Sequence, residues 1–148
     1  MKPIGYWLNR TDRALTHSMD CLLAEYGLTR IAWQVLNVVQ NAVQDAQGNR
    51  DSGPPARDRD VLTVLAANAD AATLTAAVEA VLAGGWATRP EPDRLALTGD
   101  GRGRLAAVAE RVHAFRDLSA AGISPEEYRT AVSVLERMTR NLESLQTT

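Results

Sequence analysis

One stretch, residues 70–98, limits the fold of this chain more than any other. It reads DAATLTAAVEAVLAGGWATRPEPDRLALT, and its first half places Leu74 and Val81 on one helical face. The double glycine at positions 84 and 85 then ends the helix, because glycine readily adopts the left-handed conformation needed there. Two short strand candidates follow, separated by a Pro-Glu-Pro-Asp turn that keeps the hairpin short. The stretch therefore predicts a helix followed directly by a two-stranded β-hairpin.

Three helices are predicted before this stretch. Apolar residues recur every three or four positions over residues 4–26, which predicts a long first helix. Thr29 is placed to cap a second helix, and Asp60 is placed to cap a short third one. Residues 44–59 collect glycine, proline and charged residues without apolar periodicity. They predict a loop between the second and third helices.

Two more helices are predicted after the hairpin. Thr98 can cap the first of them, although the glycines at positions 99, 101 and 103 predict a loose first turn. After a break at Ala121-Gly122, the sequence Ser124-Pro125-Glu126-Glu127 forms a capping box with proline at the first helical position. The last helix then carries apolar residues spaced by threes and fours: Tyr128, Val132, Leu135, Met138, Leu142 and Leu145.

This order of elements predicts a mainly α fold of six helices and one short two-stranded hairpin, which is the outline of a winged helix-turn-helix. A chain of 148 residues with 45% hydrophobic residues is expected to form a single domain, residues 1–148. No apolar run is long enough for a secretory signal or a membrane span, so we expect a cytoplasmic protein. The single cysteine, Cys21, excludes an intrachain disulfide, and Cys21, His17 and His113 do not have the spacing of a structural zinc site.

The two terminal helices have more apolar surface than one small helical lobe can cover. Burial of apolar area stabilises by about 25 cal/mol per Å², so a shared seam between two copies would hold a dimer together. We therefore expect a homodimer that forms through the N- and C-terminal helices. The alternative is that these helices pack on each other within one chain, as in a helical bundle.

Four phrases in this order resemble the MarR family of winged-helix transcriptional regulators. They are YGLTRIAWQVL at 26–36, TLTAAVEAVLAGGWATR at 73–89, LTGDGR at 97–102 and GISPEEYRTAVSVLERM at 122–138. The resemblance covers nearly the whole chain and implies a DNA-binding homodimer. Residues 1–28 and 99–148 would form the dimerisation helices, and residues 29–98 the winged-helix lobe.

The resemblance also implies how such a dimer acts. The helix at 70–83 would enter the major groove, and the hairpin at 86–97 would reach the minor groove. A pocket between the dimerisation helices and the DNA lobe would take a small phenolic, aromatic or lipophilic effector. Repression relieved by this ligand would be the usual outcome.

The sequence departs from this pattern on the helix that would read DNA. That helix has no lysine or arginine, and positions where related proteins carry basic or hydroxyl groups hold Ala71, Ala72 and Ala76. Residues 29–98 have six arginines and eight acidic residues, a net charge of −2, although affinity for DNA depends on neutralising phosphates. DNA binding then requires the arginines to cluster while Glu91 and Asp93 point away. The predicted DNA-contact residues are Arg30, Arg57, Arg59, Ala72, Thr73, Thr75, Ala76, Arg89 and Arg94.

Few other residues indicate chemistry. His17 and Cys21 share one face of the first helix, which permits a reactive thiol, but we favour Cys21 as a buried small hydrophobe. His17, Asp20 and Trp33 are the predicted pocket residues, with core packing as the alternative for each. No glycine-rich phosphate loop, nucleophile elbow or paired-histidine motif is present, so we expect neither an enzyme nor a cofactor.

Two functional hypotheses follow. The first is a ligand-responsive, dimeric DNA-binding regulator, most simply a repressor. The second is a degenerate winged-helix dimer that binds a small molecule or a partner protein without sequence-specific DNA readout. The alanine-rich face of the helix at 70–83 is smooth enough to pack against protein, which supports the second hypothesis.

Overall fold

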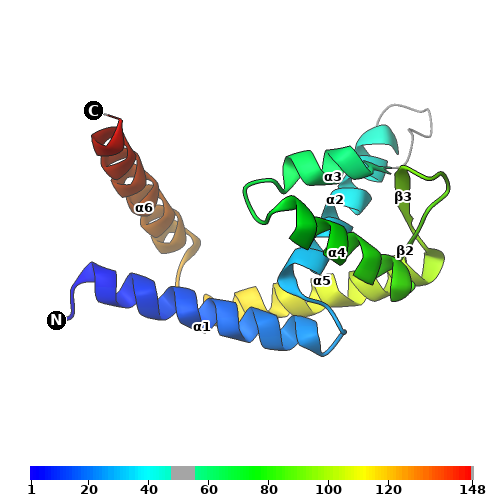
Figure 1. Ribbon diagram of the computed structural model, residues 1–148. Coiled ribbons are helices and arrows are strands. Elements are labelled where there is room, and N and C mark those ends of the chain that lie inside the picture. The colour runs from blue at the N-terminus through cyan, green and yellow to red at the C-terminus, as the bar shows by residue number, and fades with distance from the viewer. Residues whose placement is uncertain (48–55, 148) are drawn as a thin grey trace. The chain divides into compact units, whose positions relative to one another are not determined.

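The computed structural model describes the backbone of residues 1–47 and 56–147, and the side chains of all of these except 43–47. Its elements are α1 (Ile4–Ala24), α2 (Arg30–Gln47), β1 (Ala56–Arg57), α3 (Asp58–Val64), α4 (Ala71–Ala83), β2 (Ala87–Thr88), β3 (Arg94–Leu97), α5 (Gly99–Ser119) and α6 (Pro125–Gln146) (Figure 1). The chain divides into two compact units, residues 1–112 and 113–148, which are described separately. The predicted mainly α winged helix-turn-helix is confirmed.

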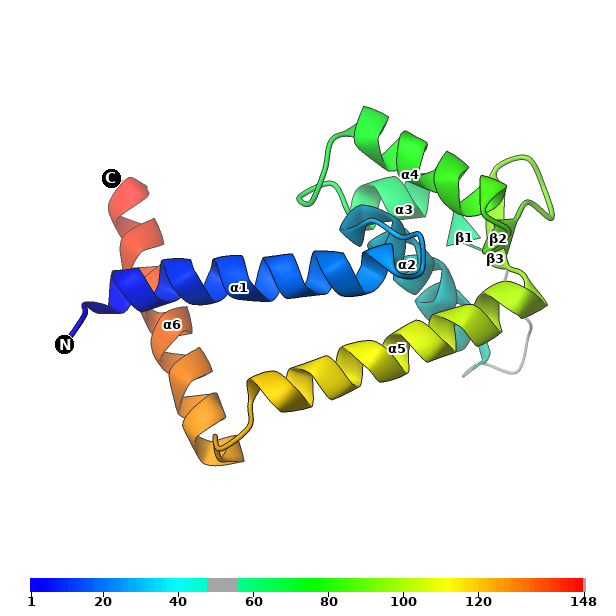
Figure 2. The ribbon, with the colours of Figure 1, turned by 90° about the horizontal axis from the view of Figure 1, so that it is seen from below.

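Helix α2 forms the centre of the first unit. Its Val35, Leu36 and Val39 are fully buried, and α2 packs against α3, α4 and β3. Helices α3 and α4 lie side by side in both ribbon views (Figures 1 and 2). The predicted inner face of α4 is confirmed, since Leu74 and Val81 are each 1% exposed. Periodicity of apolar residues was sufficient to identify this core.

The hairpin is part of a sheet with one more strand than predicted. The strand order is β1-β3-β2, and both pairings are antiparallel. Ala56 pairs with Leu95, and both are buried. The third strand was missed because two residues are too short to carry a period-2 pattern.

The predicted loop at 44–59 is wrong at both ends. Helix α2 continues to Gln47, and α3 begins at Asp58 rather than after Asp60; the part from 48 to 55 lies outside the described residues. Asp60 is at the third helical position of α3, where its Oδ2 accepts the Arg57 backbone N–H at 3.2 Å. An acidic residue stabilises a helix start both at the cap and in the first turn, so its presence alone did not fix the boundary.

The predicted stop at Gly85 and the predicted caps at Thr29 and Thr98 are confirmed. Gly85 has φ +76°, and the amide of the next residue, Trp86, donates to the Val81 carbonyl at 3.1 Å. Thr29 Oγ1 accepts the Ala32 amide at 3.2 Å. The start of α5 is regular rather than loose, because Thr98 Oγ1 accepts the Gly101 amide at 2.8 Å.

Helix α5 is joined to the end of α1 within the first unit. Arg111 Nη2 lies 3.0 Å from Glu25 Oε2. The Glu25 carboxylate raises the pKa of the Arg111 guanidinium. Leu105, Val108 and Val112 form the buried side of α5 in this unit.

Helix α6 belongs to the second unit. It begins with the predicted capping box, in which Ser124 Oγ accepts the Glu127 amide at 3.1 Å and Glu127 Oε1 accepts the Ser124 amide at 3.0 Å. These bonds lower the pKa of the Glu127 carboxyl. None of the residues in α6 is buried. Its exposed large apolar side chains are Tyr128, Val132, Val134, Leu135, Leu142 and Leu145.

Candidate nucleic-acid interface

The outward face of α4 consists almost entirely of small, uncharged side chains. Ala72, Thr73, Thr75 and Ala76, the predicted base-contact residues, are all exposed. Glu79 is the one charged residue in this helix. In Figure 2, α4 lies at the outer edge of its lobe, with α3 behind it. The face can make van der Waals contacts and short hydrogen bonds, but it has no guanidinium for a bidentate contact with guanine.

Asp70 fixes the start of this helix. Its Oδ1 accepts the Thr73 backbone N–H at 2.8 Å, so Asp70 is the N-cap of α4. Hydrogen bonds from the Thr73 side chain and backbone lower the pKa of the Asp70 carboxyl below its ordinary value of 3.8. The hydrogen bond between Asp70 and Thr73 therefore stabilises the first turn of α4, and Thr73 is also one of the exposed residues of its outward face.

The Asp70 cap predicts a specific pH dependence of stability. Because the pKa is lower in the folded state, the ionised carboxylate stabilises the fold above its unfolded pKa, and this contribution disappears as pH falls through the folded value. Urea unfolding of the native chain and of Asp70→Asn should therefore show a stability difference that becomes smaller below about pH 4. A difference that stays constant from pH 7 to pH 3 would contradict this assignment.

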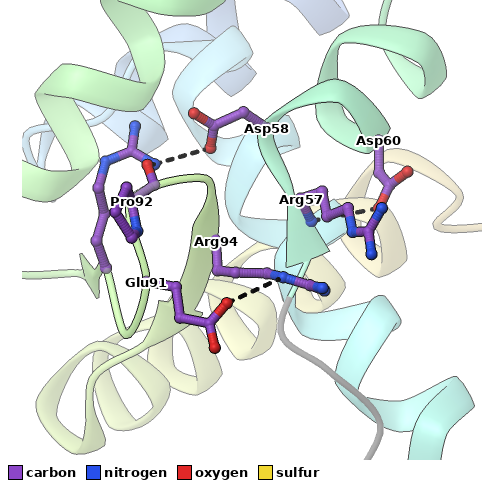
Figure 3. Close-up of polar contacts among 7 residues, drawn as sticks. Arg57, Asp58, Asp60, Glu91, Pro92 and Arg94 are labelled. Carbon is purple, nitrogen blue, oxygen red and sulfur yellow. Dashed lines mark hydrogen bonds and ion pairs between the residues drawn. The ribbon is translucent and has the colours of Figure 1, made fainter.

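The β2–β3 hairpin is the wing of the fold, and its two arginines, Arg89 and Arg94, contact acceptors within the lobe. Arg89 Nη1 lies 2.9 Å from Asp58 Oδ1 and 3.1 Å from the Pro92 carbonyl oxygen. Arg94 Nε lies 3.7 Å from Glu91 Oε2, and the Arg94 side chain is only 14% exposed. Figure 3 shows Glu91, in the turn between β2 and β3, directed toward Arg94. Glu91 therefore does not point away from the arginines, which was the arrangement that the sequence required for DNA binding.

The remaining predicted phosphate contacts lie on different elements. Arg57 pairs with Arg94 across the neighbouring strands β1 and β3, so these two cations are side by side. Arg59 is exposed on α3, and Arg30 is exposed at the start of α2, with its Nε 3.9 Å from Asp20 Oδ1. Asp58 was missed as a site residue. It is 31 positions from Arg89, and no local pattern links two such residues.

A pocket of about 630 Å³ opens near the junction of α1 and α2. It is lined by Asp20, Ala24, Leu28, Thr29, Arg30, Ile31, Gln34 and Asn68. Asp20 lines this pocket, whereas His17 and Trp33 are not among its lining residues. Gln34 Oε1 accepts a hydrogen bond from Asn68 Nδ2 at 3.3 Å, which joins α2 to the turn before α4.

Cys21 is exposed, so the expectation of a buried cysteine is wrong for this chain. Its Sγ lies 3.7 Å from His17 Nε2, one helical turn away on α1. Among the described residues, no three histidine, cysteine or acidic side chains are grouped to hold a metal ion. In the same part of the chain, no helix has the length and apolarity needed to cross a membrane.

Neither a protein-family model nor a curated protein matches this sequence. Solved structures do match its fold. A MarR-family transcriptional regulator from Rhodococcus sp. RHA1 is 19% identical, with a TM-score of 0.63 over 96% of this chain and 91% of that one. The reduced form of MarR from E. coli is 16% identical, with a TM-score of 0.67 over 93% and 94%. MepR from S. aureus, solved in complex with DNA, is 14% identical, with a TM-score of 0.67 over 95% and 96%. This chain therefore has the winged-helix fold of the MarR-family transcriptional regulators.

Proposed function

We propose that this chain is a cytoplasmic MarR-family transcriptional regulator that binds double-stranded DNA as a homodimer. One observation carries this proposal: the outward face of α4 is exposed while its inner face is buried in the lobe. The fold that presents this face matches MepR in its DNA complex over 95% of this chain. Helix α4 would enter the major groove, with Ala72, Thr73, Thr75 and Ala76 at the base edges. Arg30, Arg57 and Arg59 would lie toward the phosphates.

The homodimer is supported by the exposed apolar side chains of the terminal helices. On α1 these are Ile4, Tyr6, Trp7, Leu8 and Leu15, and on α6 they include Leu142 and Leu145, which are 58% and 71% exposed. Large apolar side chains exposed on a helix in this number usually mark an interface. A second copy of the chain would cover it and would supply the second half of a two-fold DNA-binding unit.

We further propose that the pocket near the α1–α2 junction receives a small aromatic or lipophilic effector. Ala24, Leu28 and Ile31 offer apolar surface, and Arg30 offers a cation at the rim. Asn68 lines the pocket and lies two residues before Asp70, the cap of α4. A ligand that displaces Asn68 would therefore act on the position of the DNA-reading helix, which would relieve repression.

The second candidate function is a winged-helix dimer that binds a small molecule or a partner protein without reading DNA. The observation in its favour is electrostatic. No basic residue lies on α4, and Arg89 and Arg94 both contact carboxylates. A neutral helix face with shielded arginines suits a protein partner better than a phosphate backbone.

A mobility shift at low salt with the DNA upstream of the coding sequence tests the proposal. Ala76→Glu places a negative charge on the outward face of α4, and Ala109→Glu places the same charge on an exposed position of α5. We expect Ala76→Glu to weaken binding by roughly tenfold or more, since like charges in the groove are repulsive, and Ala109→Glu to have little effect. Equal effects of the two variants, or no salt-dependent binding by the native chain, would count against DNA recognition through α4.

A further inference from the structure

The tip of the wing is tied to the first residue of α3 by two independent contacts. The Asp58 backbone N–H donates to the Asp93 carbonyl at 3.1 Å, and the Asp58 carboxylate accepts from Arg89 at 2.9 Å. Arg89 also donates to the Pro92 carbonyl at 3.1 Å. The guanidinium is thus held between α3 and the hairpin turn, and Asp58 is the residue that links them.

The position of this cluster matters for DNA binding. Figure 3 shows Asp58 at the start of α3 facing the Pro92 turn, with Glu91 and Arg94 lower on the same hairpin. Each wing arginine therefore has a carboxylate where a DNA phosphate would otherwise bind. A guanidinium presents the same donors to a carboxylate as to a phosphate, so the two anions compete for it.

We propose that Asp58 is an internal counterion that holds Arg89 as a wing-positioning residue and withholds its charge from DNA. This inference rests on the proposed DNA-binding function and refines it. To present Nη1 to a phosphate, Arg89 must give up one hydrogen bond to a carboxylate and one to a carbonyl. The Asp58 carboxylate would then remain close to the DNA backbone, where it repels the phosphates.

Partial exposure makes this contact reversible rather than permanent. The Arg89 and Asp58 side chains are 32% and 39% exposed, so water and salt screen their attraction. Arg94 is less accessible, at 14%, and is also close to Glu91. Arg89 is consequently the wing cation whose release can change DNA affinity, and Asp58 controls that release.

The substitution Asp58→Asn tests the inference, because it removes the charge and keeps an oxygen that can accept from Arg89. The measurement is the slope of log Kobs against log salt concentration, on one duplex of fixed sequence. We expect Asp58→Asn to steepen the slope by about 0.9 per subunit and to raise affinity by roughly fivefold to tenfold at 0.1 M salt, since one more phosphate is neutralised. Arg89→Gln alone should leave the slope of the native chain unchanged.

Two controls separate a released arginine from a general change in charge. Asp60→Asn removes a carboxylate two residues away that accepts the Arg57 backbone amide, whereas Arg89 donates to Asp58, so the slope should not change. The double variant Asp58→Asn/Arg89→Gln should lose the gain, because Arg89 is the group that makes the new contact. Circular dichroism would verify that each variant is folded.

The outcomes also distinguish this inference from the proposed function. If the native chain binds DNA but Asp58→Asn leaves the slope unchanged, or Asp60→Asn has the same effect, the internal-counterion role is wrong while DNA binding stands. If Arg89→Gln makes the slope shallower by about 0.9, Arg89 already contacts a phosphate in the native chain, and the inference is also wrong. If the native chain does not bind and Asp58→Asn does, the inference holds and the native function is not DNA binding. Absence of binding by both proteins would overturn both proposals.

Discussion

Gly101→Ala is expected to destabilise the fold by about 3 kcal/mol and to lower the midpoint of thermal unfolding by roughly 6–12 °C. Gly101 is buried near the start of α5, and a Cβ atom built there would lie 1.9 Å from the Trp86 carbonyl oxygen and 2.9 Å from Thr98 Oγ1. The obstructing atoms include backbone, so they cannot move aside as a flexible side chain would. The junction of the hairpin with α5 would have to open.

Gly103→Ala provides a matched control. It lies two residues further along the same helix, and a Cβ at this position would have no neighbour within 4 Å. Replacing an unobstructed helical glycine by alanine stabilises by about 0.5–1 kcal/mol, so its unfolding midpoint should rise. Calorimetry at equal protein concentrations checks both variants, because an oligomer has a concentration-dependent midpoint. If Gly101→Ala were as stable as Gly103→Ala, the close packing of α5 on Trp86 would be wrong.

The second large effect concerns the apolar face of α6. We expect the native chain to have twice its 16.0 kDa mass in solution, and Leu135→Glu/Leu142→Glu to raise the dissociation constant of the dimer roughly a thousandfold or more. By two-fold symmetry the two substitutions place four carboxylates in one interface, where burial without partners is costly. Size-exclusion chromatography with light scattering measures the mass directly.

Ser133→Glu/Ser144→Glu controls for added charge on the same helix. These exposed serines are spaced so that they lie on the opposite side of α6 from Leu135 and Leu142. The control should remain dimeric. A native chain that is monomeric at micromolar concentration, or a control that dissociates as readily as the leucine variant, would contradict the proposed interface.

Local signals in the sequence were sufficient for most of the fold. Thr29, Thr98 and Ser124 were identified as caps from residue type and position, and each accepts the backbone amide three residues later. The buried face of α4 followed from a 3.6-residue period. These features depend on hydrogen bonds and packing within a few turns of the chain, so sequence contains the information needed to predict them.

Features that depend on distant partners could not be predicted in the same way. Strand β1 exists because β3, 38 positions along the chain, gives it a partner, and two residues have no periodicity of their own. The reason for glycine at position 101 is the backbone of Trp86, whereas the sequence alone indicated a weak helix start. The exposure of Cys21 was likewise missed, because residue type describes average burial and not the surroundings of one position.

In the candidate site, too, local features could be predicted from the sequence and contacts between distant residues could not. The neutral face of α4 is evident from its composition, and the structure adds that Thr73, Thr75 and their alanine neighbours are exposed together. The state of the wing arginines could not be read from the sequence, since Asp58 and Arg89 meet only after the hairpin folds against α3. The net charge of residues 29–98 predicted a weak DNA-binding surface, and the structure adds that Arg89 and Arg94 are each close to a carboxylate.

Selection of bound fragments from a random DNA library, followed by sequencing, tests the central claim most directly. A dimer with two α4 helices predicts an inverted repeat whose half-sites lie about one helical turn apart, roughly 10–10.5 base pairs between centres. Because α4 offers methyl and hydroxyl groups without a cation, contacts with thymine methyls should prevail over contacts with guanine. A library with no enriched sequence, or with a single asymmetric half-site, would contradict a two-fold symmetric DNA-reading dimer.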